Sequence, residues 1–141
     1  MTREGFEILL VEDNPGDVRL TQEVLKTSAY NTRLKVVYDG EEALDYLLQL
    51  TDKNVIPDLI LLDLNLPRRN GLEVLEVIKK HPRLMLIPIV MLTSSEAPHD
   101  IDECYSRHAN SYITKPVDFD EYFKVVNMIE KFWFSIVKLP D

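Results

Sequence analysis

The chain has 141 residues, of which 45% are hydrophobic and 28% are charged, and its net charge is −8. This length and composition are typical of one globular domain with its own core. The acidic balance argues against nucleic-acid binding and against docking on an anionic membrane, since both need clustered cations. No apolar run approaches the ~20 residues that span a bilayer, and we expect no signal peptide. The one cysteine, Cys104, cannot form an internal disulfide, so we predict a reduced, cytoplasmic protein.

The first half of the chain alternates between short apolar runs and amphipathic stretches. The run at 8–11 predicts a strand that is covered on both faces. Asn14, followed by a proline, predicts the cap and first turn of a helix, whose apolar stripe contains one polar residue, Thr21. A weaker run at 36–38 predicts a second strand, and Asp39 with the acidic residues after it predicts the start of a second helix.

The second half of the chain repeats this alternation. Three more strands are predicted, at 59–62, at 89–92 and, more weakly, at 112–113. Helices are predicted between and after them, at 71–80, at 97–108 and from 118 to about 137. The stretch before the last strand is polar and predicts only a marginal helix, whereas the final helix is rich in apolar and aromatic residues.

Strands and helices therefore alternate five times along the sequence. Right-handed crossovers between parallel strands turn this order into a doubly wound sheet with helices on both faces. We predict a flavodoxin-like α/β fold, (βα)5, with a five-stranded parallel sheet in the order 2-1-3-4-5, which is a common order in doubly wound folds. Residues 1–141 form a single domain in this prediction, with a core at about 6–133 and an aromatic helical extension to 141.

Polar residues follow four of the predicted strands, all at the same end of the sheet. They are Glu12-Asp13, Asp63, Thr93-Ser94 and Thr114-Lys115-Pro116. Three carboxylates at one point repel one another unless a cation lies between them. Mg²⁺ prefers oxygen ligands of this kind. A lysine and a hydroxyl beside such an ion suit a phosphoryl group in transfer, which needs positioning and charge neutralisation.

Each of these residues has a simpler interpretation when it is considered alone. Asp13 could only cap a helix, Thr93 could be a turn residue, and Lys115 could be a solvated surface lysine. Asp63 precedes a loop that ends in Pro67 rather than a helix, so capping explains it poorly. The joint placement of these side chains at the strand ends favours the functional interpretation.

Five segments of the chain resemble the receiver domain of two-component response regulators. They are 9–14 (LLVEDN), 57–67 (PDLILLDLNLP), 70–71 (NG), 92–94 (LTS) and 113–116 (ITKP). The resemblance runs from residue 6 to about 133, which is nearly the entire chain, and these motifs are specific as a set.

The resemblance implies a phosphoacceptor and a magnesium site. Asp63 matches the aspartate that receives the phosphoryl group. Glu12 and Asp13 match the acidic pair that holds Mg²⁺ together with Asp63 and the backbone carbonyl of Asn65. The implied partner is a histidine kinase, whose phosphohistidine supplies the phosphoryl group.

The resemblance also implies the residues that respond to phosphorylation. Thr93 matches the switch hydroxyl, Tyr112 matches the aromatic that turns inward when the hydroxyl moves, and Lys115 matches the lysine that pairs with the phosphoryl group. Pro116 is expected to follow a cis peptide bond. One departure is Ser94, since the residue after the switch hydroxyl is commonly alanine or glycine in the family. Ser94 is still small, so we expect access for the phosphodonor but a different dephosphorylation rate.

A receiver is a signalling protein rather than an enzyme in the usual sense, although it promotes its own phosphotransfer and dephosphorylation. Two enzyme classes are alternatives. A flavin-binding electron carrier shares the fold, but the acidic loop at 12–17 would repel a flavin phosphate. A phosphatase with an aspartyl nucleophile would carry that residue on the first strand, whereas Asp63 follows the third. An interaction module that never takes phosphate is a further alternative.

The final predicted helix is more apolar than packing on one sheet requires. Its apolar arc spans roughly two thirds of the circumference, whereas a surface helix needs a stripe of a little over ~100°. We predict that a second copy of the chain covers the surplus, with Phe132, Trp133 and Phe134 at the interface of a homodimer. The alternative is that this tail folds back on its own core.

The aromatic tail, the loop at 14–17 and an insertion at 49–56 are similar to the small response regulators that serve cyanobacterial phytochromes. This finer resemblance implies a light-sensing histidine kinase as the partner. We expect no DNA-binding output domain after Asp141, so the signal is expected to leave through protein contacts or through the kinase.

Overall fold

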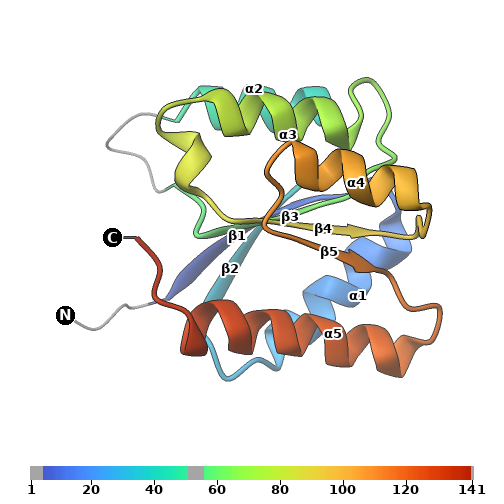
Figure 1. Ribbon diagram of the computed structural model, residues 1–141. Coiled ribbons are helices and arrows are strands. Elements are labelled where there is room, and N and C mark those ends of the chain that lie inside the picture. Colours follow the sequence, from blue (N-terminus) through green and yellow to red (C-terminus); the bar gives the residue numbers. More distant parts are fainter. Residues whose placement is uncertain (1–4, 51–55, 141) are drawn as a thin grey trace.

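The chain forms one five-stranded parallel sheet with helices on both faces, seen in the computed structural model of Figure 1, which describes residues 5–50 and 56–140. The strands lie in the order β2-β1-β3-β4-β5, and this confirms the predicted fold and strand order. Their bounds are β1 Phe6–Val11, β2 Thr32–Val37, β3 Leu59–Leu62, β4 Ile89–Thr93 and β5 Ser111–Thr114. The insertion predicted at 49–56 lies largely outside the described residues.

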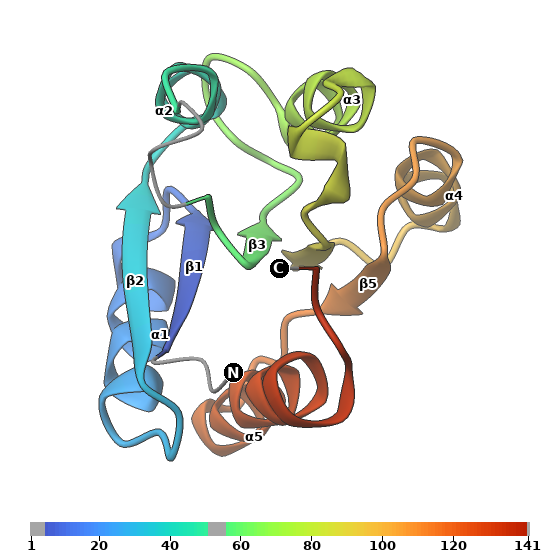
Figure 2. The same cartoon turned by 90° about the vertical axis from the view of Figure 1, so that its left-hand side faces the viewer.

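The helices form two layers around the sheet (Figure 2). Helices α1 and α5 pack against each other on one face, and α2, α3 and α4 cover the other. Their bounds are α1 Pro15–Lys26, α2 Gly40–Leu48, α3 Gly71–Lys80, α4 Pro98–Ser106 and α5 Phe119–Lys131, with a 3-10 turn η1 at Leu84–Leu86 and a π-helical turn η2 at Phe132–Ile136. No helix in the described part of the chain is long and apolar enough to cross a membrane.

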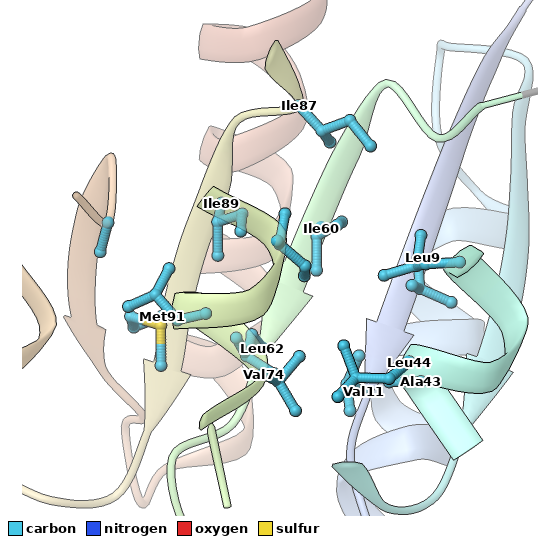
Figure 3. Close-up of a cluster of buried hydrophobic side chains, with 14 of the residues drawn as sticks. Leu9, Val11, Ala43, Leu44, Ile60, Leu62, Val74, Ile87, Ile89 and Met91 are labelled. Carbon is cyan, nitrogen blue, oxygen red and sulfur yellow. The ribbon is translucent and has the colours of Figure 1, made fainter. Parts of the chain in front are cut away.

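Each face of the sheet has its own apolar core. In the central strands the side chains alternate between the two faces, and nearly all of them are buried. Leu9, Leu62 and Met91 belong to the core beneath α2 and α3, which Figure 3 shows. Their neighbours Leu10 and Leu61 belong to the core beneath α1 and α5. The unbroken apolar runs in the sequence arise because both faces of these strands are covered.

The turns after the strands are set by side-chain caps and by one close approach. Asn14 accepts hydrogen bonds from the backbone N–H of Gly16 and of Asp17, at 2.9 and 3.1 Å, so it caps α1 as predicted. Gly71 begins α3 against the loop after β3, where an added Cβ would lie 2.3 Å from the carbonyl oxygen of Asp63. Only glycine fits there, and α3 can therefore start directly behind Asp63.

Some predicted element bounds are wrong at the edge of the sheet. The second strand begins at Thr32 rather than at residue 36, and Tyr38 lies beyond its end with half of its surface exposed. As an edge strand, β2 has alternating burial and no continuous apolar run. The helix predicted at 97–108 is well formed but shorter, at Pro98–Ser106.

The final helix differs from its prediction in a way that matters for its aromatic residues. Regular α-helix ends at Lys131, and the turn that follows is closed by a hydrogen bond of 2.9 Å from the Val137 N–H to the Phe132 carbonyl. This wider turn directs Phe134 into the core, where its ring stacks on that of Phe6 with centroids 4.0 Å apart. Phe134 is 9% exposed. The prediction that it lies at the dimer interface is therefore wrong, because its ring packs inside its own chain.

The predicted cis peptide bond before Pro116 is also wrong, since no cis bond occurs among the described residues. The trans form of such a bond is the more stable one by about 0.5–1 kcal/mol. With the trans bond in place, the Lys115 side chain still reaches the carboxylates at the strand ends.

Candidate functional site

Three carboxylates meet at the carboxyl end of the sheet, where the strand order reverses between β1 and β3. Glu12 and Asp13 directly follow β1, and Asp63 directly follows β3. One oxygen atom from each of the three lies within 4.8 Å of the others. Glu12 and Asp63 are buried, whereas Asp13 is exposed, so the cluster opens to solvent on one side. Ligands of doubly wound folds bind in this position.

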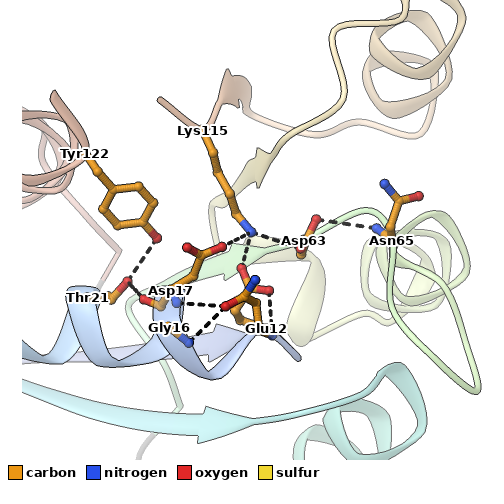
Figure 4. Close-up of polar contacts among 9 residues, drawn as sticks. Glu12, Gly16, Asp17, Thr21, Asp63, Asn65, Lys115 and Tyr122 are labelled. Atoms are coloured by element: carbon orange, nitrogen blue, oxygen red, sulfur yellow. Dashed lines mark hydrogen bonds and ion pairs between the residues drawn. The ribbon is translucent and has the colours of Figure 1, made fainter. Parts of the chain in front are cut away.

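Lys115 follows β5 and reaches across the sheet to this cluster (Figure 4). Its ammonium group donates to Glu12, to Asp17 at 2.9 Å and to Asp63 at 3.1 Å. An ammonium group has three N–H donors, so each carboxylate takes one of them. Burial opposes the charged form, but the hydrogen bonds to Glu12 and Asp17 and the negative charges of Asp63 and Glu12 together outweigh it, so the pKa of Lys115 lies above its ordinary value. The lysine is therefore a fixed positive charge.

Glu12 is the least solvated member of the cluster, at 2% exposure. Burial raises its pKa to about 7, and the nearby charge of Asp63 adds to the rise, while the hydrogen bond from Lys115 opposes it. The backbone N–H of Asn14 donates to the other carboxylate oxygen at 3.1 Å. A carboxylate this hard to ionise gains strongly from a second positive charge nearby.

Thr93 ends β4 beside the cluster. Its side chain is completely buried, and its hydroxyl oxygen has no hydrogen-bond partner among the described residues. Its carbonyl oxygen accepts from the Lys115 N–H at 2.7 Å. A buried hydroxyl without a partner costs about 1–3 kcal/mol, and such a cost is typical of a functional position.

Tyr112 lies on β5 and contacts the loop that follows Thr93. Its hydroxyl donates to the carbonyl oxygen of Ser95 at 2.9 Å, and its backbone N–H donates to the hydroxyl of Tyr105 on α4 at 3.1 Å. The ring is partly buried, and burial raises the pKa of the phenol above its usual range. The side chain thus ties β5 to the loop between β4 and α4.

Asn65 and Asp17 complete the surroundings. The Asn65 N–H donates to Asp63 at 3.4 Å, so the loop after β3 folds around the carboxylate. Asp17, in the first turn of α1, was not among the predicted site residues. No local pattern in the sequence identifies it, because its contact with Lys115 depends on how the start of α1 lies against the end of β5. Three carboxylates, those of Glu12, Asp17 and Asp63, therefore surround one ammonium group, and Asp13 lies in the same acidic cluster.

This arrangement suits a hard cation and an anionic group together. The donor atoms are all oxygen, which Mg²⁺ and similar ions prefer. The excess of negative charge needs such an ion for balance. Lys115 and the unpartnered Thr93 hydroxyl then offer donors to a tetrahedral anion at Asp63.

Comparison with known proteins identifies the family. Residues 8–127 match the model of the response regulator receiver domain. The chain belongs to this family. The receiver is thus a signalling protein of two-component systems, as its motifs indicated.

Similar proteins cover nearly all of the receiver. Response regulator Rcp1 of Synechocystis is 47% identical and covers 94% of this chain and 92% of its own. The solved structure of its Mn²⁺-bound form has a TM-score of 0.90 at 46% identity, with 96% and 99% of the two chains covered. The phosphorylated cyanobacterial phytochrome response regulator RcpA has a TM-score of 0.92 at 45% identity, covering 97% and 99%.

A further relative is named for a process other than phytochrome signalling. The probable methanogenesis regulatory protein FilR2 of Methanothrix harundinacea is 39% identical and covers 97% of this chain and 89% of its own. The receiver is therefore close to the phytochrome response regulators in sequence and fold, and somewhat less similar in sequence to a regulator of methanogenesis.

Proposed function

We propose that the receiver accepts a phosphoryl group on Asp63 from the phosphohistidine of a histidine kinase. A carboxylate oxygen of Asp63 bonds to phosphorus while the P–N bond breaks, and the electron pair of that bond remains on the imidazole. The observation that carries this proposal is the position of Asp63, which lies within the acidic cluster and 3.1 Å from the Lys115 ammonium group.

A divalent cation, Mg²⁺ in the cell, would be held by Glu12, Asp13, Asp63 and the backbone carbonyl of Asn65. When bound, it supplies charge neutralisation for the carboxylates and the phosphoryl oxygens. The donor set of oxygen atoms supports this, as does the Mn²⁺-bound form of the similar Rcp1. Lys115 then donates to a phosphoryl oxygen.

The phosphoryl group would also provide the partner that the Thr93 hydroxyl lacks. Movement of Thr93 toward it opens space for Tyr112, which gives up its hydrogen bond to Ser95 and turns inward. Attack of water on phosphorus breaks the bond to Asp63 and releases inorganic phosphate, so the receiver resets itself. Ser94, beside Thr93, is small enough to leave room for that water.

The experiment is incubation with acetyl phosphate and Mg²⁺, followed by intact mass measurement. The wild-type protein is expected to gain one phosphoryl group, and Asp63→Asn is expected to gain none, because an amide oxygen is a poor nucleophile. Asp45→Asn, which removes an exposed carboxylate from α2, is the matched control and should behave as wild type. A phosphoryl group on Asp63→Asn, or none on the wild type, would contradict the proposal.

We further propose that the kinase is a phytochrome-type light sensor. The support is the similarity to Rcp1 and to RcpA, a cyanobacterial phytochrome response regulator. Phosphotransfer from a panel of kinases tests this proposal, and preference for a kinase without a phytochrome module would contradict it.

We also propose that the receiver forms a homodimer through an apolar groove between β5 and α5. The groove has a volume of about 580 Å³, and Ile113, Met128, Phe132 and Trp133 are among its lining residues. Met128 is 69% exposed and Phe132 is 48% exposed, so the groove lies open on the isolated chain. A second copy presents the same apolar face and would cover it.

A further inference from the structure

Asp17 is placed beside the site by the start of α1. Its backbone N–H is held by the Asn14 cap at 3.1 Å, and its side chain turns toward Lys115 (Figure 4). The carboxylate oxygen lies 2.9 Å from the lysine nitrogen, and the Asp17 side chain is 25% exposed. This contact is 0.2 Å shorter than that of Asp63 with the same nitrogen, at 3.1 Å. It is therefore a close ion pair within the pocket.

Lys115 has three carboxylate partners, and two of them also belong to the candidate metal site. Glu12 and Asp63 belong to the cluster that can hold a cation, and Asp63 is also the proposed phosphoacceptor. Asp17 lies outside that cluster, as far as the described residues go. We propose that Asp17 is a positioning residue for phosphoryl transfer, because it is the anchor that holds the Lys115 ammonium group while the other two partners change.

This role of Asp17 rests on the proposed function and follows from how the charges change during the transfer. When an Asp63 oxygen bonds to phosphorus, its carboxylate charge is lost and its hold on Lys115 weakens. A bound cation takes up part of the charge of Glu12. Asp17 keeps its full charge throughout, so the ammonium group stays in place and its third N–H points toward the phosphoryl oxygen.

The backbone of Asp17 is held from a second side, which supports a positioning role. Its carbonyl oxygen accepts from the Thr21 hydroxyl at 2.9 Å, and that hydroxyl lies 3.1 Å from the hydroxyl of Tyr122. Tyr122 is 2% exposed and belongs to α5, the helix that follows β5 and Lys115 in the chain. These contacts explain why a polar residue interrupts the apolar stripe of α1, and they fix the first turn of α1 relative to α5.

The competing explanation is that Asp17 only stabilises the positive end of the α1 dipole. In that case its removal would lower the stability of the fold and leave the rate of transfer unchanged. The two explanations therefore differ in a rate that can be measured with a saturating concentration of Mg²⁺, where weaker cation binding has no effect.

The test measures phosphorylation by acetyl phosphate in Asp17→Asn, Lys115→Ala and the double variant. Asp17→Asn keeps the size of the side chain, and its rate should fall about tenfold, the effect of losing one charge-assisted hydrogen bond. In the double variant, Asp17→Asn should cause no further loss, because Asp17 acts through Lys115. Asp17→Glu restores the charge one carbon farther out, and its rate should lie between those of Asp17→Asn and wild type.

Glu23→Gln is the matched control, since it removes one negative charge from an exposed position on the same helix. A readout without phosphodonor is the ¹⁵N resonance of the Lys115 ammonium group, assigned by its loss in Lys115→Ala. This signal should be protected from exchange in wild type and in Glu23→Gln, and should broaden in Asp17→Asn. Thermal melting checks that each variant is folded.

The outcomes separate this inference from the proposed function. If the wild type takes no phosphoryl group, the proposed function fails. If the wild type is phosphorylated and Asp17→Asn matches its rate and its ammonium signal, the positioning role is overturned. A double variant slower than Lys115→Ala also overturns it, since Asp17 would then act by another route.

Discussion

Two buried polar side chains of the receiver, Glu130 and Thr93, differ in whether they have hydrogen-bond partners. Glu130, at 1% exposure, accepts hydrogen bonds from the hydroxyls of Ser28 and Thr32, both at 2.8 Å. The Thr93 hydroxyl, also fully buried, has no partner in the described part of the chain. Glu130 is satisfied within the fold and joins α5 to Ser28, which follows α1, and to Thr32 at the start of β2. For Thr93, a group that enters the pocket can supply the partner.

Glu130 gives the stability of the receiver a pH dependence whose sign follows from its burial. Burial raises the pKa of its carboxyl group, and the hydrogen bonds from Thr32 and Ser28 oppose the rise. The folded state therefore holds this proton more tightly than the unfolded state does. The stabilisation is complete below the unfolded pKa and is lost as the pH rises through the folded pKa.

The variant Glu130→Gln should remove this dependence, because its amide keeps an acceptor oxygen and does not ionise. Urea unfolding from pH 4 to pH 8 measures the effect. The free energy of unfolding of Glu130→Gln should increase relative to that of wild type as the pH rises. Glu121→Gln, an exposed position on the same helix, serves as the control and should follow wild type. A constant difference between Glu130→Gln and wild type over this range would contradict the assignment.

At the scale of single residues, the sequence predicts the site residues that lie at strand ends. It does not predict the residues whose roles depend on tertiary contacts. Glu12 and Asp63 were predictable because each directly follows an apolar run, and Lys115 because only Thr114 separates it from one. Parallel strands bring those points to one edge. Asp17 and Glu130 were not predictable, since their roles depend on which side chains other helices place next to them. Periodicity along one helix contains no information on such partners.

At the level of elements, the last helix is divided between core and surface. Phe134 stacks on Phe6 and makes an edge contact with Tyr30 at 6.3 Å. Phe119, at the start of the same helix, is 54% exposed. Phe134→Ala should therefore lower the free energy of unfolding by about 3 kcal/mol, whereas Phe119→Ala should change it by about 0.5 kcal/mol or less. Denaturant melts with equal slopes check this prediction, and similar losses for both variants would contradict it.

The same helix shows where prediction of elements from sequence stops. The central strands and the capped starts of α1 and α2 were predictable, because burial on both faces and cap residues leave local signals. The π-helical turn after Lys131 has no such signal. Within it, Phe134 stacks on Phe6, and this contact exists only once β1 and the last helix have packed together.

For the whole molecule, β5 connects the pocket of the proposed phosphoacceptor with the apolar groove. Lys115 follows its end in the pocket, Ile113 lines the groove, and Tyr112 contacts the loop after Thr93. A change at Asp63 that moves Thr93 and Tyr112 therefore acts on the strand that forms one wall of the groove. Phosphorylation and dimerisation can be coupled through this strand, since each would favour one position of it.

The homodimer is tested by sedimentation of variants that place a charge in the groove. Met128→Glu should convert the dimer into a monomer, because a carboxylate buried between two apolar faces has no partner there. Met85→Glu is the matched control, since Met85 is likewise an exposed methionine, at 48% exposure, but lies on η1, away from α5. This variant should remain dimeric. Both variants should melt near the wild-type temperature, as surface substitutions usually do.

Repeating the sedimentation with beryllofluoride and Mg²⁺ shows whether the pocket controls the groove. If β5 transmits the change, the dissociation constant of the wild-type dimer shifts on addition of the phosphoryl mimic, and Asp63→Asn shows no shift. A wild-type monomer in both states would contradict the homodimer. If Met128→Glu then also lost phosphotransfer from the kinase while still reacting with acetyl phosphate, the groove would be the kinase's docking surface instead, because only the protein donor needs that face.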